Sequence, residues 1–227
     1  MWPVCEMSVF RVGLSRPLCR LGKPNWKFMN SNINDFWLWF SGFADCLPKN
    51  DPPEAALDDL LERLHLIDNR IYFELSINTP TKELTLTAQG DVDAFPVVDA
   101  IVAAAPERDD WSFIALKPPM GFDFTFRNNG VVLNAADVWF LPLKSQSDPN
   151  ALGLRLGVPD ADAIFGAQTV DAAYTILDTG IGERSTATDI QHVAVGNLPD
   201  NPEANGYLKL PELTDYIAFH KTKHTAT

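Results

Sequence analysis

Two stretches of the chain repeat the same order of apolar periodicities, which limits the folds it can adopt. Residues 71–117 alternate apolar and polar positions twice, then space apolar residues as a helix does, and then alternate again. Period two is typical of half-buried strands, and a stripe at i, i+3, i+4 and i+7 is typical of helices. Residues 138–196 show the same order, so each stretch is predicted to be strand, strand, helix, strand. In the second stretch we expect strands at 138–143, 152–158 and 190–196 and a helix at 169–179.

Two helices are expected before the first of these stretches. The first helix could be capped by Asn32, Asn34 or Asp35, and its apolar face would run from Phe36 to Leu47. Cys46 falls near this face and is expected to be a small core residue. A capping box of Asp51 and Glu54 opens the second helix. The predicted fold class is α+β: a largely antiparallel sheet with helices mainly on one face, in two strand-strand-helix-strand halves preceded by two helices. The Asn129-Gly130 pair predicts a hairpin between the halves.

The ends of the chain differ from this body. Residues 1–28 have no helical or strand period and three prolines, so we expect a disordered leader or a start-site extension. Residues 29–221 are predicted to form a single α+β domain, including a C-terminal segment too apolar to be free and therefore docked on the surface. Residues 222–227 are predicted to be a flexible tail.

The charge of the chain excludes some classes of partner. The net charge is −12, and residues 1–28 carry five basic residues against one acidic one, a net of +4, which leaves −16 for residues 29–227. A phosphate backbone would repel such a body, so no nucleic-acid partner is expected. No apolar run reaches the roughly 20 residues that span a bilayer, so no membrane partner is expected either. The acidity is a solubility feature in one interpretation and a docking face for a basic protein in the other.

Several phrases of the body are similar to a known group of proteins. They include "FWLWF", "LTLTAQGD", "AAAPERDDWSFIALKPPMGFDFTF", "DVWFLPL" and "LDTGIGERSTATDIQHVAVGNLP", between about Phe36 and Phe219. Together they resemble a family of bacterial hypothetical proteins to which no activity is assigned. The resemblance implies the extent of the domain and a bacterial cytoplasmic protein. It implies no catalytic or binding residue.

Candidate catalytic groups are few. The sequence has no nucleophile-elbow, Walker or zinc-binding pattern, so neither a cofactor nor a metal site is expected. His192 is the histidine best placed for acid–base work, and Glu183 and Glu74 are the carboxylates that could act with it. A hydrolase or transferase using these residues is one hypothesis. The other is a soluble acidic globular domain that acts as a protein-interaction or ligand-binding module.

Binding candidates come from the middle of the chain and from the "GIGER" stretch. Trp111 belongs to an aromatic-rich set of strands. Lys117 opens a rigid "KPPMGF" loop that could border a cleft, and its charge could meet an anion. Arg184 is favourably placed near the end of the predicted helix. The expected partner is a protein, and it would be a basic protein if the acidic body is a docking face. The sequence leaves the oligomeric state open.

The glycines of "GIGER" follow a predicted helix rather than lead into one, which argues against a phosphate loop. We therefore expect Gly180 or Gly182 to be a helix cap, with replacement by alanine costing on the order of 1 kcal/mol. Glu183 is expected to bond to nearby backbone N–H groups, hydroxyls or a basic side chain.

Overall fold

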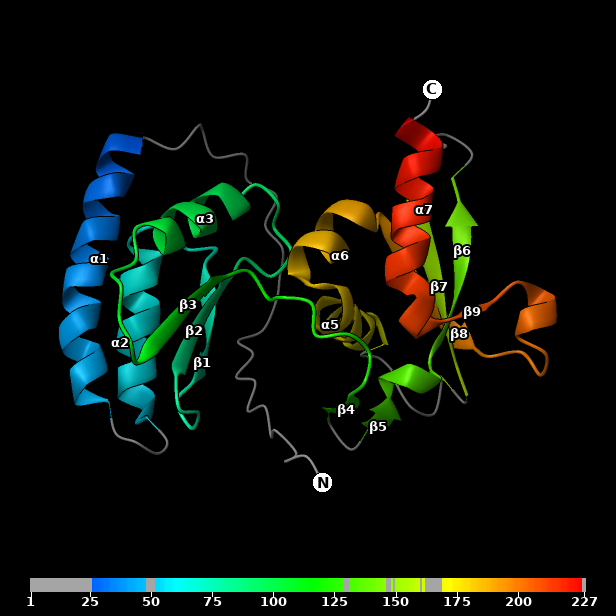
Figure 1. Ribbon diagram of the computed structural model, residues 1–227, viewed down its shortest axis with the longest axis horizontal. Helices are drawn as coiled ribbons and strands as arrows, with labels where there is room; N and C mark the ends of the chain where they lie inside the picture. The colour runs from blue at the N-terminus through cyan, green and yellow to red at the C-terminus, as the bar shows by residue number, and fades with distance from the viewer. Residues whose placement is uncertain are drawn as a thin grey trace.

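The computed structural model describes residues 26–47, 52–128, 131–145, 148, 150–159, 161 and 169–225. These residues form two lobes that lie side by side, each built on its own open sheet (Figure 1). The α+β prediction is confirmed. The strands are divided among three sheets rather than joined in one, because each lobe buries its strands around a separate apolar cluster.

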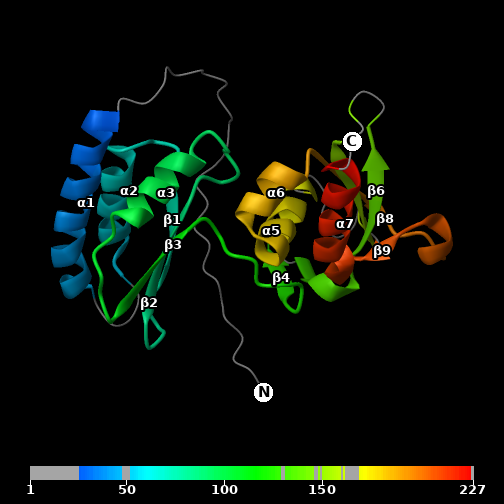
Figure 2. The same cartoon turned by 45° about the horizontal axis from the view of Figure 1, so that its top comes forward.

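The N-terminal lobe has three helices and a three-stranded sheet. The sheet order is β1-β2-β3, with β1 and β2 antiparallel and β2 and β3 parallel. Helices α1 and α2 lie on the side of this sheet that faces away from the other lobe (Figures 1 and 2). The elements are α1 (Trp26–Cys46), α2 (Glu54–His65), β1 (Tyr72–Ser76), β2 (Lys82–Thr87), α3 (Phe95–Ala103) and β3 (Trp111–Ala115).

The C-terminal lobe contains a four-stranded sheet of order β8-β7-β6-β9 and a separate β4-β5 hairpin. Strands β6 and β7 are antiparallel, and β7 and β8 are parallel. The elements are β4 (Thr125–Asn128), β5 (Val131–Asn134), β6 (Trp139–Lys144), β7 (Leu152–Val158), α5 (Thr169–Ile181), α6 (Glu183–Asp189), β8 (His192–Asn197), β9 (Leu208–Lys209) and α7 (Leu213–Thr225), with short 3₁₀ turns at Ala135–Asp137, Glu203–Asn205 and Leu210–Glu212.

The two lobes share one topology. In the first, an antiparallel strand pair is followed by α3 and by a strand parallel to the second of the pair. In the second, β6 and β7 are followed by α5 and α6 and then by β8, which is parallel to β7. The predicted strand-strand-helix-strand order is therefore confirmed in both halves. The parallel pairings follow from the helix between the strands, because such a crossover brings the chain back in the same direction.

Aromatic residues dominate the core of the N-terminal lobe. Phe40 of α1 is fully buried and meets Trp111 of β3 edge to face, with ring centroids 5.1 Å apart. The indole N–H of Trp37 donates to the carbonyl of Ile101 in α3 at 2.8 Å, which fixes the two helices together. The predicted apolar face of the first helix is thus confirmed at Trp37 and Phe40.

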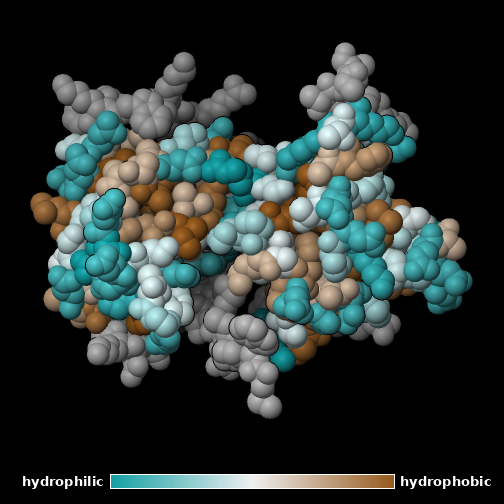
Figure 3. Space-filling view, in the orientation of Figure 1, coloured by the Kyte–Doolittle hydropathy of each residue, from teal (hydrophilic) through white to brown (hydrophobic). Residues whose placement is uncertain are grey.

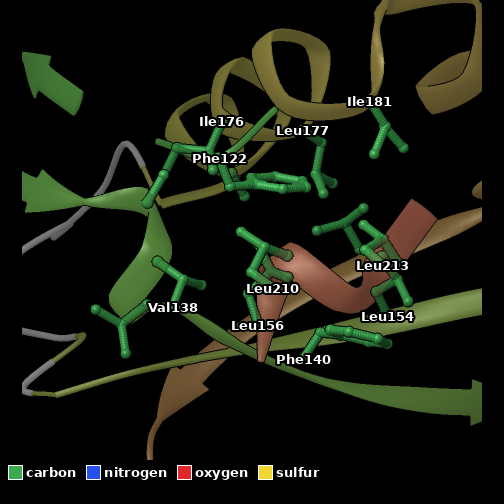
Figure 4. Close-up of a cluster of buried hydrophobic side chains, with 14 of the residues drawn as sticks. Phe122, Val138, Phe140, Leu154, Leu156, Ile176, Leu177, Ile181, Leu210 and Leu213 are labelled. Atoms are coloured by element: carbon green, nitrogen blue, oxygen red, sulfur yellow. The ribbon is translucent and has the colours of Figure 1, made fainter. Parts of the chain in front are cut away.

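The core of the C-terminal lobe lies between its sheet and its helices. Figure 4 shows Phe122 beside Ile176 and Leu177 of α5, with side chains of the sheet on the other side. Leu210 and Leu213 enter the same cluster and are fully buried. The C-terminal segment is therefore docked into this core, as its apolar residues predict.

Two details of the first helix differ from the prediction. It begins at Trp26, so Asn32, Asn34 and Asp35 lie within the helix and not at its cap. The amide of Asn32 donates to the carbonyl of Leu66 at 2.8 Å, which gives it a role between helices that spacing cannot reveal. Cys46 is exposed rather than in the core, because it is the last helical residue. Residues 1–25 of the expected leader and the turn at 129–130 lie outside the described residues.

Hydrophilic residues are spread over both lobes on the face drawn in Figure 3, with apolar ones in smaller patches between them. Among the described residues, no helix combines the length and the apolar character that crossing a bilayer requires.

Candidate functional site

The linker between the lobes is held by hydrogen bonds along its whole length. Leu116 donates its N–H to Leu86 at 2.8 Å, and Lys117 donates to the carboxylate of Glu183 at 3.2 Å. The next two residues are prolines, which have no N–H to satisfy. Met120 and Gly121 then donate their N–H groups to carbonyls in the last turn of α5, those of Thr179 and Gly180, at 2.9 and 3.0 Å. The linker is therefore a fixed joint, since each of its donors has a partner.

The "GIGER" stretch forms the other side of this joint. Gly182 separates α5 from α6 with φ +83°, a left-handed conformation that favours glycine, and it is the N-cap of α6. The cap prediction is confirmed at Gly182. The expectation that no helix follows is wrong, because α6 starts at Glu183. Gly180 lies inside α5, and a Cβ there would meet the ring of Phe122 at 2.0 Å.

Glu183 is fully buried, and both of its carboxylate oxygens are bonded. Its Oε2 accepts from the hydroxyl of Thr87 at 2.7 Å and from the N–H of Lys117 at 3.2 Å. Its Oε1 accepts from the N–H groups of Ala88 and Gly90, both at 3.0 Å. The expectation that Glu183 bonds to backbone N–H and hydroxyl groups is confirmed. Three of the donors belong to the N-terminal lobe and the fourth, Lys117, belongs to the linker that leaves it, whereas the carboxylate belongs to the C-terminal lobe. This cluster therefore joins the two lobes.

The segments that bond Glu183 have unusual backbone conformations. Gln89 has φ +52° and Leu116 has φ +62°, and no other non-glycine residue of the described part has a positive φ. Gln89 lies between the Ala88 and Gly90 donors, and Leu116 directly precedes the Lys117 donor. Such conformations persist where the surrounding structure enforces them, and they gather at functional and clamping sites.

Two ion pairs flank the Glu183 cluster. The Nζ of Lys117 lies 2.6 Å from the Oε1 of Glu74. The guanidinium of Arg184 lies 2.7 Å from Asp99 of α3 and 5.2 Å from the centre of the Phe95 ring. Arg184 therefore crosses between the lobes, as its neighbour Glu183 does.

A cleft of about 480 Å³ lies beside the joint. It is lined by both lobes: Ala115, Leu116, Lys117, Pro118 and Pro119 on one side, and Ile181, Gly182, Arg184, Ser185, Thr188, Asp189 and Lys221 on the other. The cations of this lining are neutralised by acids, Lys117 by Glu74, Arg184 by Asp99 and Lys221 by Asp189. The structure thus brings four of the predicted site residues, Glu74, Lys117, Glu183 and Arg184, to the lobe junction.

The other two predicted site residues lie elsewhere. His192 is exposed at the first position of β8, and among the described residues it makes no hydrogen bond or ion pair with Glu183 or Glu74. Trp111 is buried in the aromatic core at 4% exposure. Its indole N–H has no hydrogen-bond partner among the described residues. The carboxylate–histidine pair of the enzyme hypothesis is therefore not formed in this arrangement.

An ion pair supports the turn that bonds Glu183. Arg70 binds Asp68 at 2.6 Å and reaches Asp91, which follows this turn, at 3.4 Å. Burial disfavours the charged form of Asp68, but hydrogen bonds from Arg70 outweigh it and hold the pKa of Asp68 below its ordinary value.

A second feature, which the sequence analysis missed, lies on the outer face of α2. Glu54, Asp58 and Glu62 follow one another at i, i+4 and i+8 and are exposed, and Leu66 continues the line with 68% exposure. No ion pair neutralises these three acids among the described residues. An open hollow of about 490 Å³ adjoins Glu62 and Leu66 at the C-terminal end of α2, lined by Asp59, Glu62, Arg63, His65 and Leu66. We call Glu54, Asp58, Glu62 and Leu66 the α2 stripe. The four-residue spacing was present in the sequence and could have revealed it.

Comparisons with known proteins give no further assignment. No protein-family model, curated protein or solved structure matches the chain. Within the part of the chain that the structure describes, no group of three or more histidine, cysteine or acidic side chains could hold a metal ion.

Proposed function

We propose that the protein is an interaction module that binds a basic partner protein through the α2 stripe. The observation that carries this proposal is the row of exposed, unneutralised acids Glu54, Asp58 and Glu62, which ends at exposed Leu66. Like charges at i, i+4 destabilise a helix by a few tenths of a kcal/mol for each pair. A basic segment would remove this repulsion, and an apolar side chain beside its cations would cover Leu66.

The state of the other candidate groups supports a binding role over a catalytic one. A general base needs a free lone pair within reach of a substrate proton. Glu183 has four donors on its two oxygens, and Glu74 is engaged by Lys117. The hydrolase or transferase hypothesis would require these bonds to break and His192 to move. The binding proposal requires neither.

The net charge of −16 over residues 29–227 fits this role as well, because it attracts a basic protein over a distance of about 10 Å at moderate salt. The resemblance to bacterial hypothetical proteins leads us to propose a bacterial cytoplasmic setting for this partnership.

The test compares two variants that remove the same number of charges. The stripe variant is Glu54→Gln/Asp58→Asn/Glu62→Gln. The control variant is Asp123→Asn/Asp200→Asn/Glu203→Gln, which removes three exposed acids from the C-terminal lobe. Fluorescence anisotropy measures the affinity of each protein for a labelled helical peptide with lysine at every fourth position and leucine beside it.

We expect the stripe variant to bind this peptide at least about threefold more weakly than the unmodified protein, since exposed ion pairs contribute roughly 0.2–1 kcal/mol each. The control variant should change the affinity by less than about twofold, and Leu66→Ser should weaken binding without changing its salt dependence. Equal losses in the stripe and control variants would mean that only net charge matters, which would contradict the proposed docking face.

A further inference from the structure

Three of the four donors that bind Glu183, those of Thr87, Ala88 and Gly90, are arranged by the N-terminal lobe itself. The hydroxyl of Thr87 also accepts from the N–H of Gln89 at 3.0 Å, which closes the turn after β2. Asp91 donates to the carbonyl of Ala88 at 3.0 Å, and Arg70 reaches Asp91 from the end of the preceding turn. None of these bonds involves Glu183, so the positions of the donors do not depend on it.

The Lys117 donor is held by the strand pairing that precedes it, and the carbonyl of Lys117 also accepts from the backbone N–H of Glu183 at 3.0 Å, a bond that does not need the Glu183 side chain. Leu116 extends the β2–β3 pairing by donating to Leu86 at 2.8 Å, and its side chain is buried at 2% exposure. Its positive φ then turns the next N–H, that of Lys117, toward the Glu183 carboxylate. At Gln89 a second positive φ lies between the Ala88 and Gly90 donors, whose N–H groups point at one oxygen. Backbone N–H groups that converge from such turns form a concave site for an anion.

The site recognises its anion with neutral donors. Three backbone N–H groups and one hydroxyl bond the carboxylate, and no cation does so among the described residues. Two donors meet each oxygen, which matches the two oxygens of a carboxylate. Hydrogen bonds to a charged acceptor are the stronger class, and in a buried site they are not screened by water.

We propose that the N-terminal lobe carries a carboxylate-binding site, formed by the Thr87 hydroxyl and the N–H groups of Ala88, Gly90 and Lys117, and that Glu183 is the ligand that the C-terminal lobe inserts into it. The lobe arrangement then depends on occupancy of this site by a carboxylate, whether or not the carboxylate is attached to the chain. A small free carboxylate should replace the side chain of Glu183 when that side chain is removed.

The test uses Glu183→Ala in the full chain, which leaves two buried donors (Thr87 and Ala88) and two part-buried donors (Gly90 and Lys117) without an acceptor, and a space that formate or acetate can fill. Unpaired buried donors are costly, and we expect the Tm to fall by on the order of 10 °C. Sodium formate should raise the Tm of this variant by several degrees with a saturable, millimolar concentration dependence, since so small an ion does not bind more tightly than about 1 mM. Acetate should act similarly, and acetamide or sodium chloride should not.

Two further variants separate recognition of the carboxylate from general effects. Glu203→Ala removes an exposed glutamate, so its Tm should be unchanged and its response to formate gives the ordinary salt effect. Glu183→Gln keeps the shape but places an NH₂ group against two donors, so we expect an intermediate Tm and no specific response to formate. If Glu183→Ala is unfolded at 25 °C, its refolding yield in formate is compared with the yield in equimolar chloride.

The proposal is overturned if formate affects Glu183→Ala no more than it affects Glu203→Ala, in the Tm or in the refolding yield. It is also overturned if Glu183→Gln is as stable as the unmodified protein, because the site would then not distinguish a carboxylate from an amide.

Discussion

The replacement of Gly180 by alanine gives the sharpest test of packing at the lobe junction. Gly180 lies in α5 without a positive φ, so alanine suits its backbone and helix propensity alone would favour the change by about 1 kcal/mol. The added Cβ would lie 2.0 Å from Cε1 and 2.3 Å from Cζ of Phe122. Carbon atoms pack at about 3.5–4.0 Å, so the ring would have to move by roughly 1.5 Å.

Phe122 has little freedom to move that far. It is 5% exposed and packs beside Ile176 and Leu177 (Figure 4). Overpacking of a tight core costs about 1–3 kcal/mol or more, which exceeds the gain in helix propensity. We expect Gly180→Ala to lose on the order of 1–2 kcal/mol of unfolding free energy and about 2–8 °C in Tm.

Urea unfolding followed by tryptophan fluorescence measures this loss, with Gly42→Ala as the matched control. Gly42 is exposed within α1, and nothing lies within 4 Å of an added Cβ. The same substitution there should stabilise the protein by about 0.5–1 kcal/mol. The double variant Gly180→Ala/Phe122→Leu should lose less unfolding free energy than the sum of the losses in the two single variants. Equal gains in stability at Gly180 and Gly42 would refute the steric reasoning.

Three other predictions concern single contacts. A double-mutant cycle of Arg184→Ala and Asp99→Ala should give a coupling energy below about 1 kcal/mol, because both side chains are about half exposed. A larger coupling energy would mean that this pair rather than Glu183 joins the lobes. The depressed pKa of Asp68 stabilises the fold above the unfolded pKa of about 3.9, and this contribution is lost as the pH falls through the folded pKa. Asp68→Asn should therefore lower the free energy of unfolding at pH 7 and flatten the decline in stability below pH 4. Parallel pH–stability curves of the two proteins would count against this. Leu213→Ala should cost about 2–5 kcal/mol, as expected for a fully buried leucine, and an unchanged urea midpoint would show that the C-terminal segment is not part of the core.

The sequence predicts the elements of the fold well where apolar periodicity is strong. The paired strands of each half and the helix between them emerge from alternation and from apolar stripes, and their order is confirmed. The pattern cannot show that the strands divide into two main sheets, because Leu84 and Leu154 are equally buried whichever core they enter. Short α6 is missed because "ERSTATD" has no apolar stripe and is held by contacts with the other lobe.

The candidate site is predicted in part. The sequence analysis expects Glu183 to be bonded to backbone N–H groups, hydroxyls or a basic side chain, and the structure confirms the first two. The partners of Glu183 cannot be predicted, because Thr87 and Lys117 are 96 and 66 residues away in sequence. The positive φ of Leu116 cannot be predicted either, since leucine gives no signal for such a conformation.

Hydrogen exchange at the Ala88, Gly90 and Lys117 amides tests most directly whether Glu183 joins the lobes. NMR should find all three amides protected in the unmodified protein, because each donates to the buried carboxylate. In Glu183→Gln the amides that face the new NH₂ group lose their acceptor and should exchange faster, while the amide of Leu116, which donates to Leu86, stays protected. Rapid exchange of the three amides in the unmodified protein, or protection that Glu183→Gln leaves unchanged, would contradict the central role given to this carboxylate.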